Sequence, residues 1–117
     1  MIRIVWDTEE MVALADICLR REKMTKAQIE GELKALSKTL IFRADKLGIV
    51  HDDKYRNFNG MKYTYQNMLF VITDGKEGMS NANKGLYDVY DMWKNRRDSF
   101  NLLLENFNSA YREREQS

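Results

Sequence analysis

The sequence contains no proline, and this feature limits what the chain can fold into more than any other. Proline breaks helices, and the six glycines leave few other obligatory breaks, whereas the many Leu, Met, Ala, Lys, Glu and Arg residues favour helix. The 117 residues fall in the size range of one domain, and 44% apolar with 32% charged residues is typical of a globular protein. We therefore expect a single all-α domain over residues 1–117.

Two capping boxes mark where the first two helices begin. Asp7 with Glu10, and Thr25 with Gln28, have the spacing at which two side chains satisfy each other's backbone amides. Apolar residues then recur every three or four positions after each start, as they do on one face of a helix. We expect helices over residues 7–21 and 25–47, the second ended by Gly48 in a left-handed conformation.

The remainder of the chain divides into a loop, a third helix and a C-terminal helical region. Residues 49–57 lack helical periodicity, residues 58–72 regain it, and a glycine-rich turn follows over residues 73–80. The first three helices are expected to form a helix-turn-helix-like unit, and the core of the domain is expected over residues 4–95. The C-terminal region is expected to pack across this unit, with residues 96–115 as a helical extension.

Four apolar residues of the C-terminal region are separated by seven positions each: Leu86, Trp93, Phe100 and Phe107. This constant phase favours one long helix that ends at about residue 115. Arg96 and Arg97 interrupt the apolar stripe, however, so a break at this level is the alternative. The new helix would then be capped at Asp98-Ser99. The stripe also exceeds what three short helices can cover, which predicts a homodimer.

The sequence offers little for catalysis or metal binding. A single histidine, His51, and a single cysteine, Cys18, exclude the paired-histidine and Cys/His zinc sites as well as an internal disulfide. No Ser/His/Asp or Cys/His arrangement can be assembled, so we expect no enzyme activity, no metal and no cofactor. The sequence has no run of about 18 apolar residues, the length that a membrane span needs, and its N-terminus lacks the apolar stretch of a signal peptide. These features predict a cytoplasmic protein.

A polar block over residues 54–67 carries the functional prediction. Lysine and arginine can neutralise phosphate, asparagine and glutamine can read adenine, and tyrosine can stack on a base. Basic charge is concentrated nearby, with eleven basic and six acidic residues between positions 19 and 62. The predicted DNA-contacting residues are Arg56, Asn57, Asn59, Lys62, Tyr63 and Gln66, with further phosphate contacts from Lys54, Arg43 and Lys46. In the alternative interpretation the asparagines cap the helix and the tyrosines are half-buried.

Several short motifs together resemble a known family. They are Trp6-x-x-Glu9-Glu10 with Leu14, Leu33-x-x-Leu36-Ser37, Tyr55-Arg56-Asn57-x-Asn59-Gly60, Asn67-Met68 and Gly78-Met79-Ser80. Over about residues 4–95 the sequence resembles the N-terminal helical domain that precedes HNH modules in some restriction endonucleases. The resemblance implies DNA recognition without cleavage, as a restriction, defence or mobile-element accessory whose protein partner carries the catalytic activity. Tyr55 departs from the phenylalanine usual in that family, and the opening also resembles a Myb/SANT helix start.

A protein-interaction module is the alternative function. Its C-terminal heptads would associate with a partner helix or with a second copy of the chain. The net charge of only +1 favours this alternative, because dedicated DNA-binding domains are often strongly basic.

Overall fold

The computed structural model describes residues 4–112, and this part of the chain is helical without strands. The five α-helices are α1 (Thr8–Leu19), α2 (Lys26–Lys46), α3 (Phe58–Ile72), α4 (Lys84–Asn95) and α5 (Arg97–Phe107). A short 3-10 turn, η1 (Arg21–Lys23), follows α1, and a π-helical turn, η2 (Asn108–Arg112), follows α5. The predicted all-α fold is confirmed. None of the described helices is long and apolar enough to cross a membrane.

The caps and the apolar spacing predict the bounds of the first three helices to within about two residues. Both capping boxes form, with Asp7 Oδ1 accepting from the Glu10 amide at 2.9 Å and Thr25 Oγ1 accepting from the Gln28 amide at 3.1 Å. Gly48 has the predicted left-handed backbone, with φ of 73°. The first helix ends at Leu19, two residues earlier than expected, because the chain tightens there into η1.

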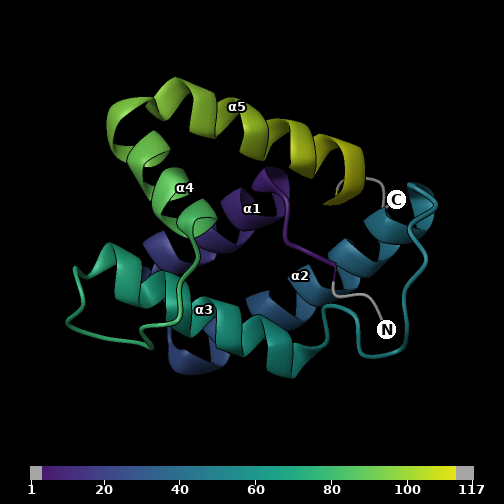
Figure 1. Cartoon of the computed structure of the whole chain (residues 1–117), viewed down its shortest axis with the longest axis horizontal. Helices are drawn as coiled ribbons and strands as arrows, with labels where there is room; N and C mark the ends of the chain where they lie inside the picture. Colours follow the sequence, from purple (N-terminus) through teal and green to yellow (C-terminus); the bar gives the residue numbers. More distant parts are fainter. Residues whose placement is uncertain (1–3, 113–117) are drawn as a thin grey trace.

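Helix α1 lies at the centre of the molecule. All four other α-helices pack against it, and in Figure 1 it lies between α5 on one side and α3 on the other. Four consecutive residues of α1 are completely buried: Val12, Ala13, Leu14 and Ala15. A helix that is surrounded in this way needs apolar side chains on almost every face, and α1 has them. Helices α1, α2 and α3 also contact one another, as a three-helix unit requires.

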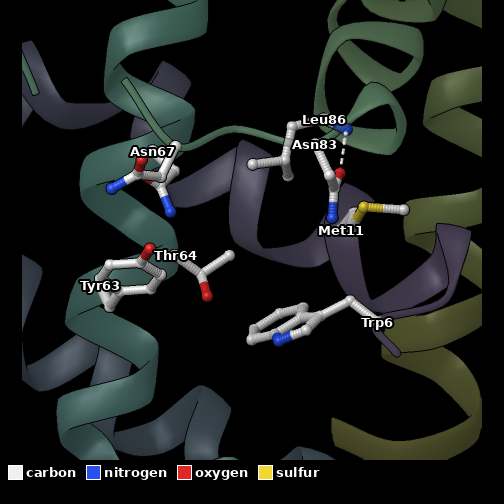
Figure 2. A pocket seen from close by; sticks show the side chains of 8 residues that line it. Trp6, Met11, Tyr63, Thr64, Asn67, Asn83 and Leu86 are labelled. Carbon is white, nitrogen blue, oxygen red and sulfur yellow. Dashed lines mark hydrogen bonds between the residues drawn. The ribbon is translucent and has the colours of Figure 1, made fainter. Parts of the chain in front are cut away.

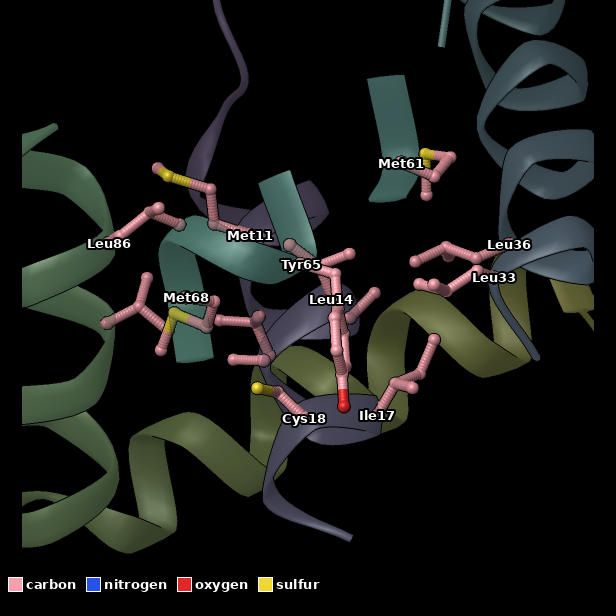
Figure 3. Packing of buried hydrophobic residues seen from close by; sticks show 14 of the residues in the cluster. Met11, Leu14, Ile17, Cys18, Leu33, Leu36, Met61, Tyr65, Met68 and Leu86 are labelled. Atoms are coloured by element: carbon pink, nitrogen blue, oxygen red, sulfur yellow. The ribbon is translucent and has the colours of Figure 1, made fainter. Parts of the chain in front are cut away.

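The hydrophobic core is built around α1 from every helix. Figure 3 shows Leu14 and Ile17 of α1 among Leu33 and Leu36 of α2 and Met68 of α3. Each of these side chains is buried, and burying one such side chain stabilises the fold by about 1.5–3 kcal/mol. The core therefore fixes how α3, which carries most of the polar block, is held against α1 and α2.

The prediction of one long C-terminal helix is wrong, and the alternative break is confirmed. Arg96 adopts φ of −140° and ψ of 56°, which ends α4 and starts α5 one position before the Asp98-Ser99 pair expected to cap it. The break lets two apolar stripes turn onto the same helix, because both α4 and α5 pack against α1. Phe100 and Phe107 are 2% and 0% exposed, so the hydrophobic core includes side chains of α5, within the predicted extension over residues 96–115.

Candidate nucleic-acid interface

Arg56, the central residue of the predicted DNA-contacting set, is directed into the protein. Its side chain is 6% exposed and its Nε donates to Glu10 Oε2 at 2.8 Å, while Nη2 donates to Glu10 Oε1 at 3.0 Å. Nη1 donates to the backbone carbonyl of Ile4, and Nη2 also donates to that of Val5, each at 3.2 Å. All of these donors are therefore used inside the fold, and Arg56 is removed from the predicted interface.

The surroundings of Arg56 explain its structural role. The guanidinium lies 4.4 Å from the centroid of the Tyr55 ring and 4.7 Å from that of Trp6, a geometry in which both rings attract the cation. Its own carbonyl accepts a 2.6 Å hydrogen bond from the Ser37 hydroxyl of α2. The residue therefore ties the loop before α3 to α1 and α2. Its backbone has φ of 48°, a left-handed conformation unusual for a residue with a side chain.

Two further predicted residues are also engaged within the protein. Arg43 on α2 is 8% exposed and forms ion pairs with Asp7 Oδ2 at 2.9 Å and Glu9 Oε1 at 3.2 Å. Asn57 caps α3, with its Oδ1 accepting from the Gly60 amide at 2.8 Å. Neither side chain is presented to a ligand, so the predicted phosphate and base contacts of these residues are not supported by their positions.

The other predicted residues of α3 lie on two different faces of the helix. Asn59 and Lys62 are exposed, Gln66 is half-buried, and their spacing of three and four residues puts them on one face of the helix. Lys62 and Gln66 border a groove between α2 and α3. Tyr63, which is 43% exposed, instead lines a hollow between α3 and the starts of α1 and α4.

Lys34 of α2 completes a cationic site that the sequence did not reveal. Its Nζ lies 5.1 Å from the centroid of the Phe58 ring, and Lys62 Nζ lies 4.7 Å from the same centroid. The two ammonium groups are therefore within about 10 Å of each other, on neighbouring helices. Lys38 is exposed one helical turn after Lys34 on the same side of α2.

We call this surface the α2–α3 basic face; it comprises Lys34, Lys38, Phe58, Asn59, Lys62 and Gln66.

The lysines of the basic face differ from the arginines in how they are paired. Neither Lys34 nor Lys62 forms an ion pair with any described residue, whereas Arg20, Arg43 and Arg56 are all paired with carboxylates. Two unpaired cations held close together repel each other, and a bound anion would relieve that repulsion. The groove beside them also contains one acid, Glu30, and an apolar floor.

Lys46 and Lys54 lie outside this arrangement. Lys46 ends α2, twelve residues after Lys34, which corresponds to roughly 18 Å along a helix. Its Nζ lies 5.8 Å from the Phe42 ring centroid, and Lys54 is exposed in the loop before α3. The structure therefore does not bring these two predicted phosphate contacts together with Lys62.

The described residues do not gather metal-binding side chains. Among them no group of three His, Cys, Asp or Glu residues is positioned to hold a metal ion. Cys18 is buried, and this burial raises the pKa of its thiol to about 12, so the nucleophilic thiolate is scarce. Tyr65, on the floor of the groove, has its pKa raised to about 12 by burial and remains neutral.

Comparisons with known proteins do not assign this arrangement to a family. A scan against models of protein families, a search of curated proteins and a search of solved structures each find no match. The functional argument therefore rests on the geometry of the α2–α3 basic face and of its surroundings.

Proposed function

We propose that this chain is a non-catalytic DNA-binding module that contacts duplex DNA through the α2–α3 basic face. The observation that carries the proposal is the pair of lysines without ion-pair partners among the described residues, Lys34 and Lys62, whose Nζ atoms lie 5.1 and 4.7 Å from the centroid of the Phe58 ring. Ammonium groups in this position neutralise phosphates and release bound counterions, which supplies most of the affinity of a DNA-binding surface. Lys38 extends the same cationic surface along α2.

The neighbouring amide side chains supply the means to distinguish sequences. Asn59 and Gln66 lie on the same face of α3 as Lys62, one on each side of it along the helix. Asparagine and glutamine amides can form two hydrogen bonds with the edge of adenine, whereas lysine contacts to phosphate carry no sequence information. In this proposal the lysines position the helix on the duplex and the amides read it.

The proposal includes a protein partner that carries the catalytic activity, as in the restriction endonucleases that the sequence resembles. The protein-interaction alternative began from the seven-residue stripe, but Leu86, Phe100 and Phe107 are buried within the chain itself. Trp93, the fourth residue of the stripe, is partly buried, and the protein-interaction alternative stays a prediction. The homodimer stays a prediction, tested by sedimentation at high micromolar concentration.

A salt titration with two matched double variants tests the proposal. Lys34→Ala/Lys62→Ala removes two cations from the basic face, and Lys23→Ala/Lys76→Ala removes two exposed cations elsewhere. Each lost phosphate contact lowers the slope of log affinity against log salt by about 0.9, so the first variant should lose nearly two units and the second none. Equal binding by the parent and a folded Lys34→Ala/Lys62→Ala variant at low and moderate salt would exclude this face.

Specificity is tested separately from affinity. Asn59→Ala and Gln66→Ala should leave the salt slope unchanged, because neither side chain carries a charge. Each should reduce discrimination between a preferred and a changed site by about 1–3 kcal/mol if its amide reads a base edge. Competition between two duplexes that differ at one base pair measures the effect. A uniform loss across all sequences would instead assign these amides to phosphate contacts.

A further inference from the structure

A second hollow lies on a different face of α3 from the basic face, between the start of α1 and the start of α4. Its volume is about 340 Å³, at the small end of the range for ligand pockets in proteins. Figure 2 shows its principal side chains, which are Trp6, Tyr63, Thr64, Asn67 and Asn83. None of the described residues that line it is charged, so it suits a neutral ligand.

Asn67 lines this hollow and carries a buried polar atom that no described residue satisfies. Its side chain belongs to a residue only 4% exposed, and its Oδ1 accepts no hydrogen bond from any described residue. A buried polar atom without a partner is unfavourable, and in a native protein it calls for a specific explanation. Turning the amide by 180° would put the NH2 group in the same unsatisfied position, so both orientations require a partner.

Asn83 and Trp6 add a second amide and a fixed aromatic ring. Asn83 Oδ1 accepts from the Leu86 amide at 3.1 Å as the cap of α4, which leaves its NH2 group as a donor toward the hollow. The Trp6 ring lies against the Arg56 guanidinium, 4.7 Å from its centroid, and that guanidinium is held by Glu10. The lining thus combines hydrogen-bonding amides with the Trp6 ring, which is held in position by its contact with the Arg56 guanidinium.

We propose that this hollow binds a nucleobase, with the base against the aromatic side chains and its polar edge on the Asn67 and Asn83 amides. An amide offers the donor and acceptor pair that matches the edge of adenine, and aromatic rings stack on the faces of bases. The inference rests on the proposed function. Lys62 and Tyr63 are consecutive in α3 and point about 100° apart, so the hollow and the basic face lie on adjoining faces of the helix. A base leaving the stack of bound DNA would reach the hollow past Tyr63. A free nucleoside offers the same chemistry, and the test separates the two sources.

The probes are adenosine alone, a fully paired duplex, and the same duplex with one unpaired adenine. The indole N–H resonance of Trp6 reports on the hollow, and that of Trp93 on α4 is the internal reference, since Trp93 does not line it. We expect adenosine or the unpaired duplex to shift the Trp6 resonance and not the Trp93 resonance. We also expect the unpaired duplex to bind at least tenfold more tightly than the paired one.

Asn67→Leu is the decisive variant, with Asn101→Leu on the exposed surface of α5 as the same chemical change elsewhere. Asn67→Leu should abolish the Trp6 shift and the preference for the unpaired duplex without weakening binding to paired DNA, and Asn101→Leu should change neither. Leucine removes the unpartnered amide, so a structural role alone predicts no ligand phenotype. Tyr63→Ala, at a half-exposed position, provides the same measurement if Asn67→Leu does not fold.

The outcomes separate this proposal from DNA binding by the basic face. A Trp6 resonance unmoved by adenosine and by both duplexes, with binding of paired DNA that still depends on Lys34 and Lys62, overturns the nucleobase site alone. Equal responses of the parent and Asn67→Leu overturn it as well. An adenosine response that needs Asn67, in a protein that binds neither duplex, supports the nucleobase site and overturns DNA as the source of the base.

Discussion

Removal of the Arg56 guanidinium should destabilise the fold severely, because it leaves the Glu10 carboxylate buried without a counter-charge. The two side chains are 6% and 2% exposed, and their closest N–O distance is 2.8 Å. Breaking a buried ion pair by removing one partner costs about 3–5 kcal/mol. Small domains have total stabilities of about 5–15 kcal/mol, so Arg56→Ala should remove a large fraction of the whole. At roughly 4 °C per kcal/mol, the melting temperature should fall by about 12–20 °C.

Chemical and thermal unfolding followed by circular dichroism measure this loss. Arg20→Ala is the matched control, because Arg20 pairs with Asp16 and Glu32 but its side chain is 40% exposed, and pairs of this kind contribute about 1 kcal/mol or less. The double variant Glu10→Gln/Arg56→Met should recover at least half of the loss, since it removes both charges together. If Arg56→Ala lowers the free energy of unfolding no more than Arg20→Ala does, Arg56 does not have the structural role described above, and it is again a candidate for contact with DNA.

Three further outcomes follow from single residues. Both ring nitrogens of His51 face oxygen acceptors, the Asp52 carbonyl and then the Asp45 carboxylate, which raises the pKa of His51 above 6.5. The contribution of these His51 contacts to the stability of the fold is therefore complete below about pH 6.5 and is lost as the pH rises through the raised pKa. Asp45→Asn should lower the pKa of His51 in an NMR titration, and an unchanged pKa would refute the pairing of His51 with Asp45. Gly78→Ala should destabilise the fold, because the backbone there has φ of 84° and an added Cβ would meet a backbone oxygen, whereas Gly31→Ala, in open space on α2, should stabilise it by about 0.5–1 kcal/mol. A denaturant titration in which Gly78→Ala stabilises the fold, or Gly31→Ala destabilises it, would contradict this prediction. Cys18, with its pKa raised to about 12 by burial, should react with a thiol reagent only on unfolding, and rapid labelling of the native protein would contradict its burial.

Features that depend on neighbouring residues could be predicted from the sequence. The capping boxes at Asp7 and Thr25, the left-handed Gly48 and the bounds of α3 all follow from side chains within four or five positions of each other. The break at Arg96 was also signalled locally, but the continuous apolar phase on both sides of it outweighed the signal. Only the packing of both α4 and α5 on α1 decides between a straight and a broken helix.

The candidate site could be predicted only in part, because its residues are sorted by contacts across the chain. Arg56 occurs in a polar block, and nothing near it indicates that its carboxylate partner lies 46 positions earlier in the sequence. Lys34 was overlooked for the reverse reason, since it is an ordinary exposed lysine until Phe58 and Lys62 are brought beside it. The pattern pointed to the start of α3, and the fold decides which of the nearby cations face outward.

The central position of α1 also determines when this protein can finish folding on the ribosome. Synthesis produces α1 before the other described helices, whereas α5, which packs against it, begins at Arg97, nearly eighty residues after α1 ends. Until α5 has left the exit tunnel, part of the apolar surface of α1 has no partner, and a nascent chain with exposed apolar surface is prone to aggregate. Chaperones that bind such surface would therefore find it on α1 while the chain is growing, and a stalled or truncated product that lacks α5 would retain it.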